Sequence, residues 1–167
     1  MAETYVPKEE EKSQDWRIQT TPYKKLADGT ELLADIYFHG GKDGNTKRYP
    51  EPDLIVNHDT TPVVLFFHAG GLTAWSRKSI NPSLVQATLK REWTLVSVDY
   101  RLLPQATAED LLEDVKDAYQ FVVDRLPSIL NNASWARGLD MARTGRRIIV
   151  AGASAGKLEN HGSRVER

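Results

Sequence analysis

Three continuous apolar runs mark the middle and the C-terminal part of this chain. They are PVVLFFH at 62–68, WTLVSVDY at 93–100 and RRIIVAG at 146–152. Each run has the length of a strand and lacks polar–apolar alternation, which is typical of strands covered on both faces. Segments with helical periodicity separate them, at 81–91 and 107–126. This alternation of strand and helix predicts an α/β fold, with a mostly parallel sheet and flanking helices.

Both predicted helices carry recognisable end signals. Asn81 is a suitable N-cap and is followed by Pro82, a residue favoured at the first helical position. Thr107 precedes the second helix, with Asp110 three residues later, close to a capping box. We expect Pro127 to end that helix, because proline lacks the backbone N–H that a helix interior needs. The apolar positions of the second helix recur at helical spacing, at Leu111, Val115, Ala118, Val122 and Leu126.

The N-terminal part of the chain has a different pattern. Residues 1–15 form a polar lead-in, and the stretch 17–38 holds two strand-like runs around Asp28-Gly29, a strong hairpin signal. Residues 39–61 are rich in Gly, Asp, Asn and Pro, and they predict a long surface loop that we interpret as an insertion. We expect a single α/β unit at 16–156 that contains this loop.

Composition narrows the possible classes of function. The 167 residues suffice for one domain with a hydrophobic core. Lys and Arg number 22 against 23 Asp and Glu, a net charge of -1, so we expect no nucleic-acid partner. The absence of cysteine excludes disulfides, thiolate metal sites and cysteine nucleophiles. The sequence shows neither a secretory signal nor a membrane span, and a cytoplasmic location is expected.

The sequence Gly152-Ala153-Ser154-Ala155-Gly156 is a G-x-S-x-G motif, and it follows an apolar strand without a gap. Its small residues permit the tight strand-to-helix turn that exposes a serine hydroxyl. The N-terminus of a following helix offers free N–H groups to a developing oxyanion. The motif therefore predicts a nucleophilic serine. The alternative reading is an ordinary or phosphate-binding glycine-rich turn.

A second glycine-rich segment, His68-Ala69-Gly70-Gly71, directly follows the strand VVLFF. Glycines at such a place can aim backbone N–H groups at a carbonyl oxygen, because no side chain blocks the approach. Taken alone, the segment is a turn. Together, the two motifs support each other, since acyl transfer needs both a nucleophile and an oxyanion hole.

Three blocks of the chain resemble those of a known family. FFHAGGLTAW, then VSVDYRLLPQAT with EDLLEDV, then IIVAGASAG resemble the HGGG, DYRLAPE and GxSAG blocks of the hormone-sensitive-lipase-like α/β-hydrolases. The resemblance runs from about Ile18 to Gly156 and implies the N-terminal half of an α/β-hydrolase domain. It implies an esterase- or lipase-type hydrolase that acts on a small-molecule ester through an acyl-enzyme at Ser154. It also implies that no metal or organic cofactor takes part.

The resemblance assigns further roles to single residues. The oxyanion hole would consist of the backbone N–H groups of Gly70, Gly71 and Ala155, with alanine standing where the family's first glycine usually is. His68 would be a structural residue of the oxyanion loop and not the catalytic base. Asp99 would belong to an architectural block and would not be the acid of a triad.

The histidine and acid that a serine nucleophile needs are not evident. After Ser154 the chain offers only Glu159 and His161 in the expected order. If a helix follows the serine, His161 lies about 10 Å along an axis leading away from it. His39 and His58 flank the predicted loop and are expected on the surface. We therefore predict little or no turnover by this chain alone.

The stretch KLENHGSRVER at 157–167 departs abruptly from the family pattern, since its only apolar residues are Leu158 and Val165. We interpret this break as the mark of a truncated product. The strand at 146–152 would then form an open apolar edge through which the chain could associate with a partner. The alternative function is a non-catalytic isoform that binds a small molecule or regulates another protein. A third possibility is a fragment that does not fold.

Overall fold

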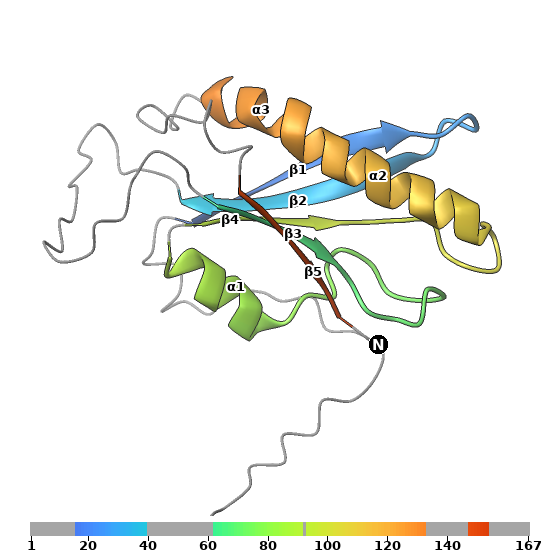
Figure 1. Ribbon diagram of the computed structural model, residues 1–167, viewed down its shortest axis with the longest axis horizontal. Coiled ribbons are helices and arrows are strands. Elements are labelled where there is room, and N and C mark those ends of the chain that lie inside the picture. The colour runs from blue at the N-terminus through green and yellow to red at the C-terminus, as the bar shows by residue number, and fades with distance from the viewer. Residues whose placement is uncertain (1–15, 40–61, 92, 133–146, 154–167) are drawn as a thin grey trace, which may run out of the picture.

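A computed structural model describes residues 16–39, 62–91, 93–132 and 147–153, and the structural statements below concern these residues (Figure 1). The predicted lead-in, nearly all of the predicted loop and the predicted polar tail lie outside the described part. Ser154 and Ala155 also lie outside it, directly after its last residue, Ala153.

The predicted hairpin forms the first two strands. β1 (Trp16–Lys25) and β2 (Glu31–His39) pair in antiparallel orientation. At the turn, Oδ1 of Asp28 accepts a hydrogen bond of 2.8 Å from the N–H of Thr30, and Gly29 has a φ of 90°. This left-handed conformation favours glycine and explains why Asp-Gly stands here. The hairpin prediction is confirmed.

The three apolar runs form the remaining strands of one five-stranded sheet. They are β3 (Val63–Phe67), β4 (Thr94–Val98) and β5 (Ile148–Gly152), and the strand order is β1-β2-β4-β3-β5. β3 pairs in parallel with both β4 and β5, whereas β2 pairs antiparallel with β4. The predicted parallel arrangement therefore holds for the last three strands, and the N-terminal hairpin makes the described sheet a mixed one.

The first two helices begin where their capping residues predict. α1 (Pro82–Leu89) starts after Asn81, whose side chain accepts a hydrogen bond from a backbone N–H of the first turn. α2 (Ala108–Asp124) starts after a complete capping box between Thr107 and Asp110. In the described part of the chain, no helix is both long and apolar enough to cross a bilayer.

A third helix corrects the expectation for Pro127. α2 already ends at Asp124, and α3 (Leu126–Asn132) follows, with Pro127 in its first turn. The missing N–H of proline does no harm there, because the first N–H groups of a helix have no partner within the helix. Pro127 therefore stands near the start of a new helix and does not simply end the preceding one.

α1 lies on one face of the sheet and α2 and α3 lie on the other (Figure 1), and a hydrophobic core forms on each side. Along β3, Val63 and Leu65 pack with the apolar side of α2 and α3, while Val64 and Phe66 pack with α1. Successive side chains of a strand point to opposite faces, so a strand with helices on both sides must be apolar throughout. This explains the continuous apolar runs of β3 and β4.

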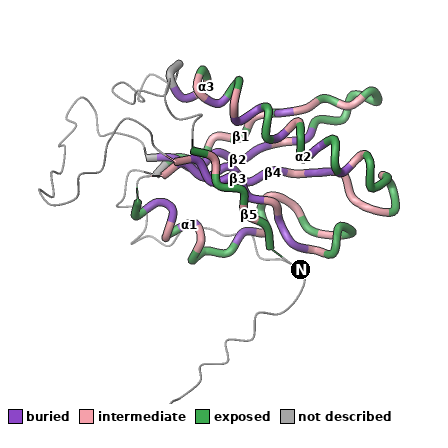
Figure 2. The backbone as a smooth tube through the Cα atoms, in the orientation of Figure 1, coloured by how far each residue is buried: buried purple, intermediate pink, exposed green. Residues whose placement is uncertain are grey.

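β5 differs from its neighbours because it lies at an edge of the described sheet with little cover (Figure 2). Ile149 is 43% exposed and Val150 is 57% exposed. Beside Val150, an apolar groove of about 480 Å³ separates β5 from α2. It is lined by Leu65, Phe67, Val115, Lys116, Tyr119, Gln120 and Val150.

Candidate functional site

The two glycine-rich segments leave the same edge of the sheet, side by side. β3 and β5 are parallel neighbours, with Phe67 at the end of one opposite Gly152 at the end of the other. Beyond this pair, the N–H of Ala153 donates a hydrogen bond of 3.2 Å to the carbonyl of Phe67. The loop that begins at His68 therefore starts next to the chain that leads into Ser154.

His68 is buried at the base of this loop and is held on two sides. Its Nδ1 atom lies 2.7 Å from the carbonyl oxygen of Ala69, and its ring stacks on Tyr100 with the ring centres 4.3 Å apart. The hydroxyl of Tyr100 donates a hydrogen bond of 2.7 Å to the carbonyl of His68. Burial lowers the pKa of His68, although its hydrogen bond to Ala69 and the charge of Asp99 oppose the shift. The lowered pKa favours the neutral imidazole, and because a carbonyl oxygen only accepts, Nδ1 is the nitrogen that carries the proton in this contact.

Two carbonyl groups of this loop accept hydrogen bonds from within the loop. The carbonyl of Ala69 accepts from His68, and the carbonyl of Gly70 accepts from both the N–H and the hydroxyl of Thr73, each at 3.1 Å. In a trans peptide, the C=O of one residue and the N–H of the next point in opposite directions. The N–H groups of Gly70 and Gly71 are thus turned away from these contacts. No acceptor among the described residues takes either N–H.

Left-handed backbone conformations are concentrated in the same loop. Gly70 has a φ of 123°, and a Cβ atom at this position would lie 2.1 Å from the carbonyl oxygen of Ala74. Gly71 has a φ of 61°. Leu72 and Trp75 also have positive φ, at 63° and 77°, although neither is glycine. Such strain is of order 1–3 kcal/mol per residue and requires firm support from the surroundings.

Arg77 supplies that support at the far end of the loop. Asp99 accepts a hydrogen bond of 2.9 Å from the Arg77 backbone N–H and one of 2.6 Å from its Nη1. The Arg77 carbonyl accepts from Ser97 at 2.7 Å, and its Nε lies 2.9 Å from Oδ1 of Asp35 without a well-directed hydrogen bond. Burial alone would lower the pKa of Arg77, but Asp35 and Asp99 raise it overall.

A further contact joins the loop to the segment after β4. The N–H of Leu103 donates a hydrogen bond of 2.8 Å to the carbonyl of Leu72. Asp99, which the resemblance makes architectural, contacts Arg77 as an anchor of the loop. The sequence reading did not find Tyr100, Thr73 or Arg77. The only sequence signal for Tyr100 was its place in the block VSVDYRLLPQAT, next to Asp99.

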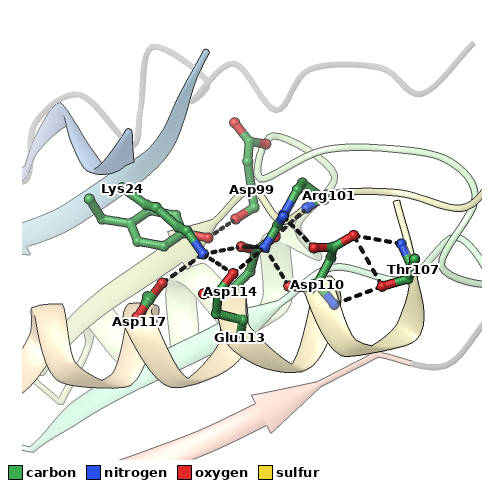
Figure 3. A network of polar contacts seen from close by, with 9 residues as sticks. Lys24, Asp99, Arg101, Thr107, Asp110, Glu113, Asp114 and Asp117 are labelled. Atoms are coloured by element: carbon green, nitrogen blue, oxygen red, sulfur yellow. Dashed lines mark hydrogen bonds and ion pairs between the residues drawn. The ribbon is translucent and has the colours of Figure 1, made fainter. Parts of the chain in front are cut away.

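An acidic cluster on α2 forms a second polar network, which is structural (Figure 3). Asp114 is fully buried and accepts hydrogen bonds from Arg101 and Lys24. Oxygen atoms of Glu113, Asp114 and Asp117 lie within 4.8 Å of one another, a spacing that could suit a cation. The Nζ of Lys24 already lies 2.7–2.9 Å from all three carboxylates, and Nη2 of Arg101 contacts Glu113 and Asp114, so two side-chain cations already occupy the cluster.

Ser154 and the residues that follow it lie outside the described part of the chain. His68 is the only histidine whose side chain belongs to that part, and its ring is buried and stacked on Tyr100. Glu159 and His161, the pair that follows Ser154 in sequence, lie outside that part. The loop that carries Gly70 and Gly71 thus begins next to the chain that leads into Ser154, and neither glycine N–H has an acceptor among the described residues.

Comparisons with known proteins agree with this arrangement. Residues 64–157, more than half of the chain, match a family model described as "alpha/beta hydrolase fold". Over 148 residues the chain is 32% identical to the non-reducing polyketide synthase atr1 of Stereocaulon alpinum, covering 86% of this chain and 5% of the synthase. The chain thus spans about one twentieth of the curated relatives that it matches.

Two solved structures of esterases are similar to this chain. The hyperthermophilic esterase of the archaeon Pyrobaculum calidifontis has a TM-score of 0.55 and 24% identity, with 84% of this chain and 35% of the esterase covered. The carboxylesterase EstE1, cloned from a metagenomic library, has a TM-score of 0.52 and 26% identity, with coverage of 84% and 37%. The chain therefore corresponds to little more than a third of each esterase.

Proposed function

The chain belongs to the hormone-sensitive-lipase-like group of the α/β-hydrolase fold family, and on this premise we propose that it carries the nucleophile half of a serine esterase site. One observation carries the proposal. The parallel pairing of β3 and β5 brings the start of the loop that carries Gly70 and Gly71 beside Ala153, the residue before Ser154, and within the described part of the chain neither glycine N–H has an acceptor. Acyl transfer needs a nucleophile and an oxyanion hole in this relation to each other.

In the proposed reaction, the Ser154 hydroxyl attacks the carbonyl carbon of an ester while a base takes its proton. The carbonyl π electrons move to the oxygen, and the N–H groups of Gly70, Gly71 and Ala155 stabilise the resulting negative charge. The intermediate collapses, the C–O bond to the alcohol breaks and an acyl-serine remains. Water then attacks the acyl-serine, releases the acid and restores the hydroxyl.

The base and the acid that orients it come from outside the described residues in this proposal. Glu159 and His161 are not expected to act as this acid and base, because their side chains are not expected to reach the Ser154 hydroxyl. We therefore propose that turnover requires a further segment of an α/β-hydrolase domain, and that this chain alone hydrolyses esters slowly or not at all. Oxyanion donors and substrate binding without the triad leave only a small part of the catalysis of a complete site.

The names of the curated relatives support a particular acyl group. Proteins called non-reducing polyketide synthases match most of this chain at 28–34% identity. We propose a polyketide acyl group as the acyl part of the substrate, held as an ester or thioester. The carbonyl carbon of both is attacked in the same way, so the roles of Ser154, Gly70 and Gly71 do not change.

A fluorophosphonate probe combined with an ester assay tests the catalytic proposal. We expect slow labelling of the chain at Ser154, no labelling of Ser154→Ala, and unchanged labelling of Ser128→Ala, which removes an exposed serine on α3. Sizeable hydrolysis of p-nitrophenyl butyrate that disappears in Ser154→Ala would contradict the predicted low turnover. Labelling that persists in Ser154→Ala would contradict the nucleophile.

The second candidate is a non-catalytic protein on the same scaffold, which binds a small molecule or regulates a partner. The observation that favours it is that His68, the one histidine side chain in the described part of the chain, is buried and stacked on Tyr100 at the base of the loop. A binding scaffold would not react with the phosphonate at Ser154 even after hours at high probe concentration. It would still bind a ligand reversibly, which separates the two candidates.

A further inference from the structure

Two bulky apolar side chains are held half-exposed in the loop that carries Gly70 and Gly71. Leu72 is 48% exposed and Trp75 is 53% exposed. Both have positive φ, a backbone conformation that favours glycine. The loop is tied down near both residues, by the bond from Leu103 to Leu72 and by the attachment of Arg77 to Asp99. Their exposure therefore belongs to a firmly held conformation.

Both side chains begin next to the N–H groups proposed to receive the oxyanion. Leu72 directly follows Gly71 in the chain. A Cβ atom built on Gly70 would lie 3.4 Å from the Cβ atom of Trp75, so the Trp75 side chain starts against that glycine. A substrate whose carbonyl oxygen reaches these N–H groups carries its substituents into the same neighbourhood.

Elsewhere among the described residues, the exposed large apolar side chains stand on helices and strands, where Val115, Tyr119 and Val150 line the groove between β5 and α2. Ile18 is on β1 and Leu112 is on α2, at 49% and 55% exposure. Single exposed apolar residues of this kind are ordinary on a protein surface. Leu72 and Trp75 differ from them because they share one strained loop next to the candidate site.

We propose that Leu72 and Trp75 form a specificity surface for a planar, apolar group attached to the reacting carbonyl carbon. A tryptophan ring offers a large flat face for stacking, and leucine adds apolar contact beside it. The inference rests on the proposed function, since it takes Gly70 and Gly71 as the oxyanion donors. It names aryl and similar flat groups as the preferred substituents of the ester.

Reversible binding of 2-naphthoate to the full chain tests the proposal without any need for turnover. Ligand-observed NMR gives the dissociation constant, and ¹⁵N-labelled indoles locate the site among the four tryptophans. We expect saturable shifts of the Trp75 indole, and no saturable binding of acetate. Trp75→Ala and Leu72→Ala should each weaken binding at least fivefold, and Trp75→Phe should restore most of it. The matched control Leu112→Ala, on α2, should bind like the wild type.

Two further measurements separate a failure of the specificity surface from a failure of the proposed esterase function. 2-Naphthol lacks the carboxylate, so tighter binding of 2-naphthoate supports a surface for the group on the carbonyl carbon, and tighter binding of 2-naphthol contradicts it. Ser154→Ala should bind 2-naphthoate within twofold of wild type, even though the phosphonate label is lost. Naphthoate that fails to saturate, or that binds both loop variants normally, overturns the specificity surface while leaving Ser154 labelling intact as support for the esterase.

Discussion

Gly70 and Gly71 both have left-handed backbones, but only Gly70 is also enclosed by its neighbours. A Cβ atom at Gly70 would overlap the carbonyl oxygen of Ala74 at 2.1 Å, whereas the nearest atom to such a Cβ at Gly71 is 4.0 Å away. We expect Gly70→Ala to lower the free energy of unfolding by about 3 kcal/mol, because strain and a backbone clash add. Gly71→Ala should lower it by about 1 kcal/mol, from the left-handed conformation alone. Urea denaturation measures both.

The control for this pair is Gly29→Ala at the hairpin turn. Gly29 has a φ of 90° and no atom within 4 Å of the added Cβ. It should therefore resemble Gly71→Ala, at about 1 kcal/mol. If Gly70→Ala and Gly71→Ala lowered the free energy of unfolding equally, the loop would have to adjust readily to an added Cβ atom. That result would contradict a firmly held loop.

Tyr100 supports the base of the loop that carries Gly70 and Gly71, and its hydroxyl can be removed with little change in volume. Tyr100→Phe keeps the ring that stacks on His68 and removes the hydroxyl that donates to the His68 carbonyl. The buried carbonyl would lose a partner, and we expect a loss of about 1–3 kcal/mol in unfolding free energy. Tyr119→Phe, at a half-exposed position on α2, should change it by less than about 0.5 kcal/mol. If Tyr100→Phe and the wild type had the same thermal unfolding temperature, the result would argue against a stabilising role for this hydrogen bond.

Sequence reasoning reached the glycines and the serine of the candidate site but not the residues that hold the loop. A G-x-S-x-G motif and an HAGG segment are local patterns, because their backbone chemistry depends on adjacent residues. Arg77 contacts Asp35 and Asp99, which stand far from it in sequence. Such contacts depend on strand order, and no short pattern encodes them.

At the scale of elements, the helix starts were predictable and the buried face of α2 was only partly so. Local capping chemistry fixed both starts, at Asn81 and Thr107. Val115 was expected on the apolar side, yet it is 37% exposed, while the neighbouring Asp114 is fully buried. Asp114 is tolerated there because Arg101 and Lys24 pair with it, a compensation that apolar periodicity does not include.

The buried carboxylate of Asp114 should make stability depend on pH in the acid range. Burial opposes its ionisation, but hydrogen bonds from Arg101 and Lys24 outweigh this and hold the pKa below its ordinary value. A depressed folded-state pKa stabilises the fold above the unfolded-state value of about 3.9, and this contribution is lost as pH falls through the folded-state pKa. We expect Asp114→Asn to cost about 3 kcal/mol at neutral pH. The difference from wild type should shrink below about pH 4.

Asp117→Asn is the matched control for this pH dependence. Asp117 contacts Lys24 at 2.7 Å, but its side chain is 43% exposed. An exposed ion pair of this kind contributes about 0–1 kcal/mol. Chemical denaturation at several pH values measures both variants. If Asp114→Asn loses no more stability than Asp117→Asn at neutral pH, the buried network is not what holds α2 against β1.

At the scale of the whole molecule, the sequence predicted the α/β class, and the order of its strands became known only from the structure. The apolar runs indicate strands covered on both faces, which holds for β3 and β4. β5 has the same apolar pattern, yet Ile149 and Val150 are exposed at the sheet edge. An apolar run shows that both faces of a strand favour burial. Whether other elements cover those faces depends on the tertiary structure. The expected open apolar edge agrees with the position of β5.

An exposed apolar edge strand should make the chain associate with itself as concentration rises. Val150→Lys places a charge at a position that is 57% exposed beside the groove between β5 and α2, and it should shift the chain toward monomer. Sedimentation velocity over a range of concentrations measures the shift. Ile18→Lys is the matched control, at 49% exposure on β1, the opposite edge of the described sheet. If Ile18→Lys restores the monomer and Val150→Lys does not, the chain associates through the hairpin edge. If only Val150→Lys does so, the chain associates through the β5 edge of the described sheet.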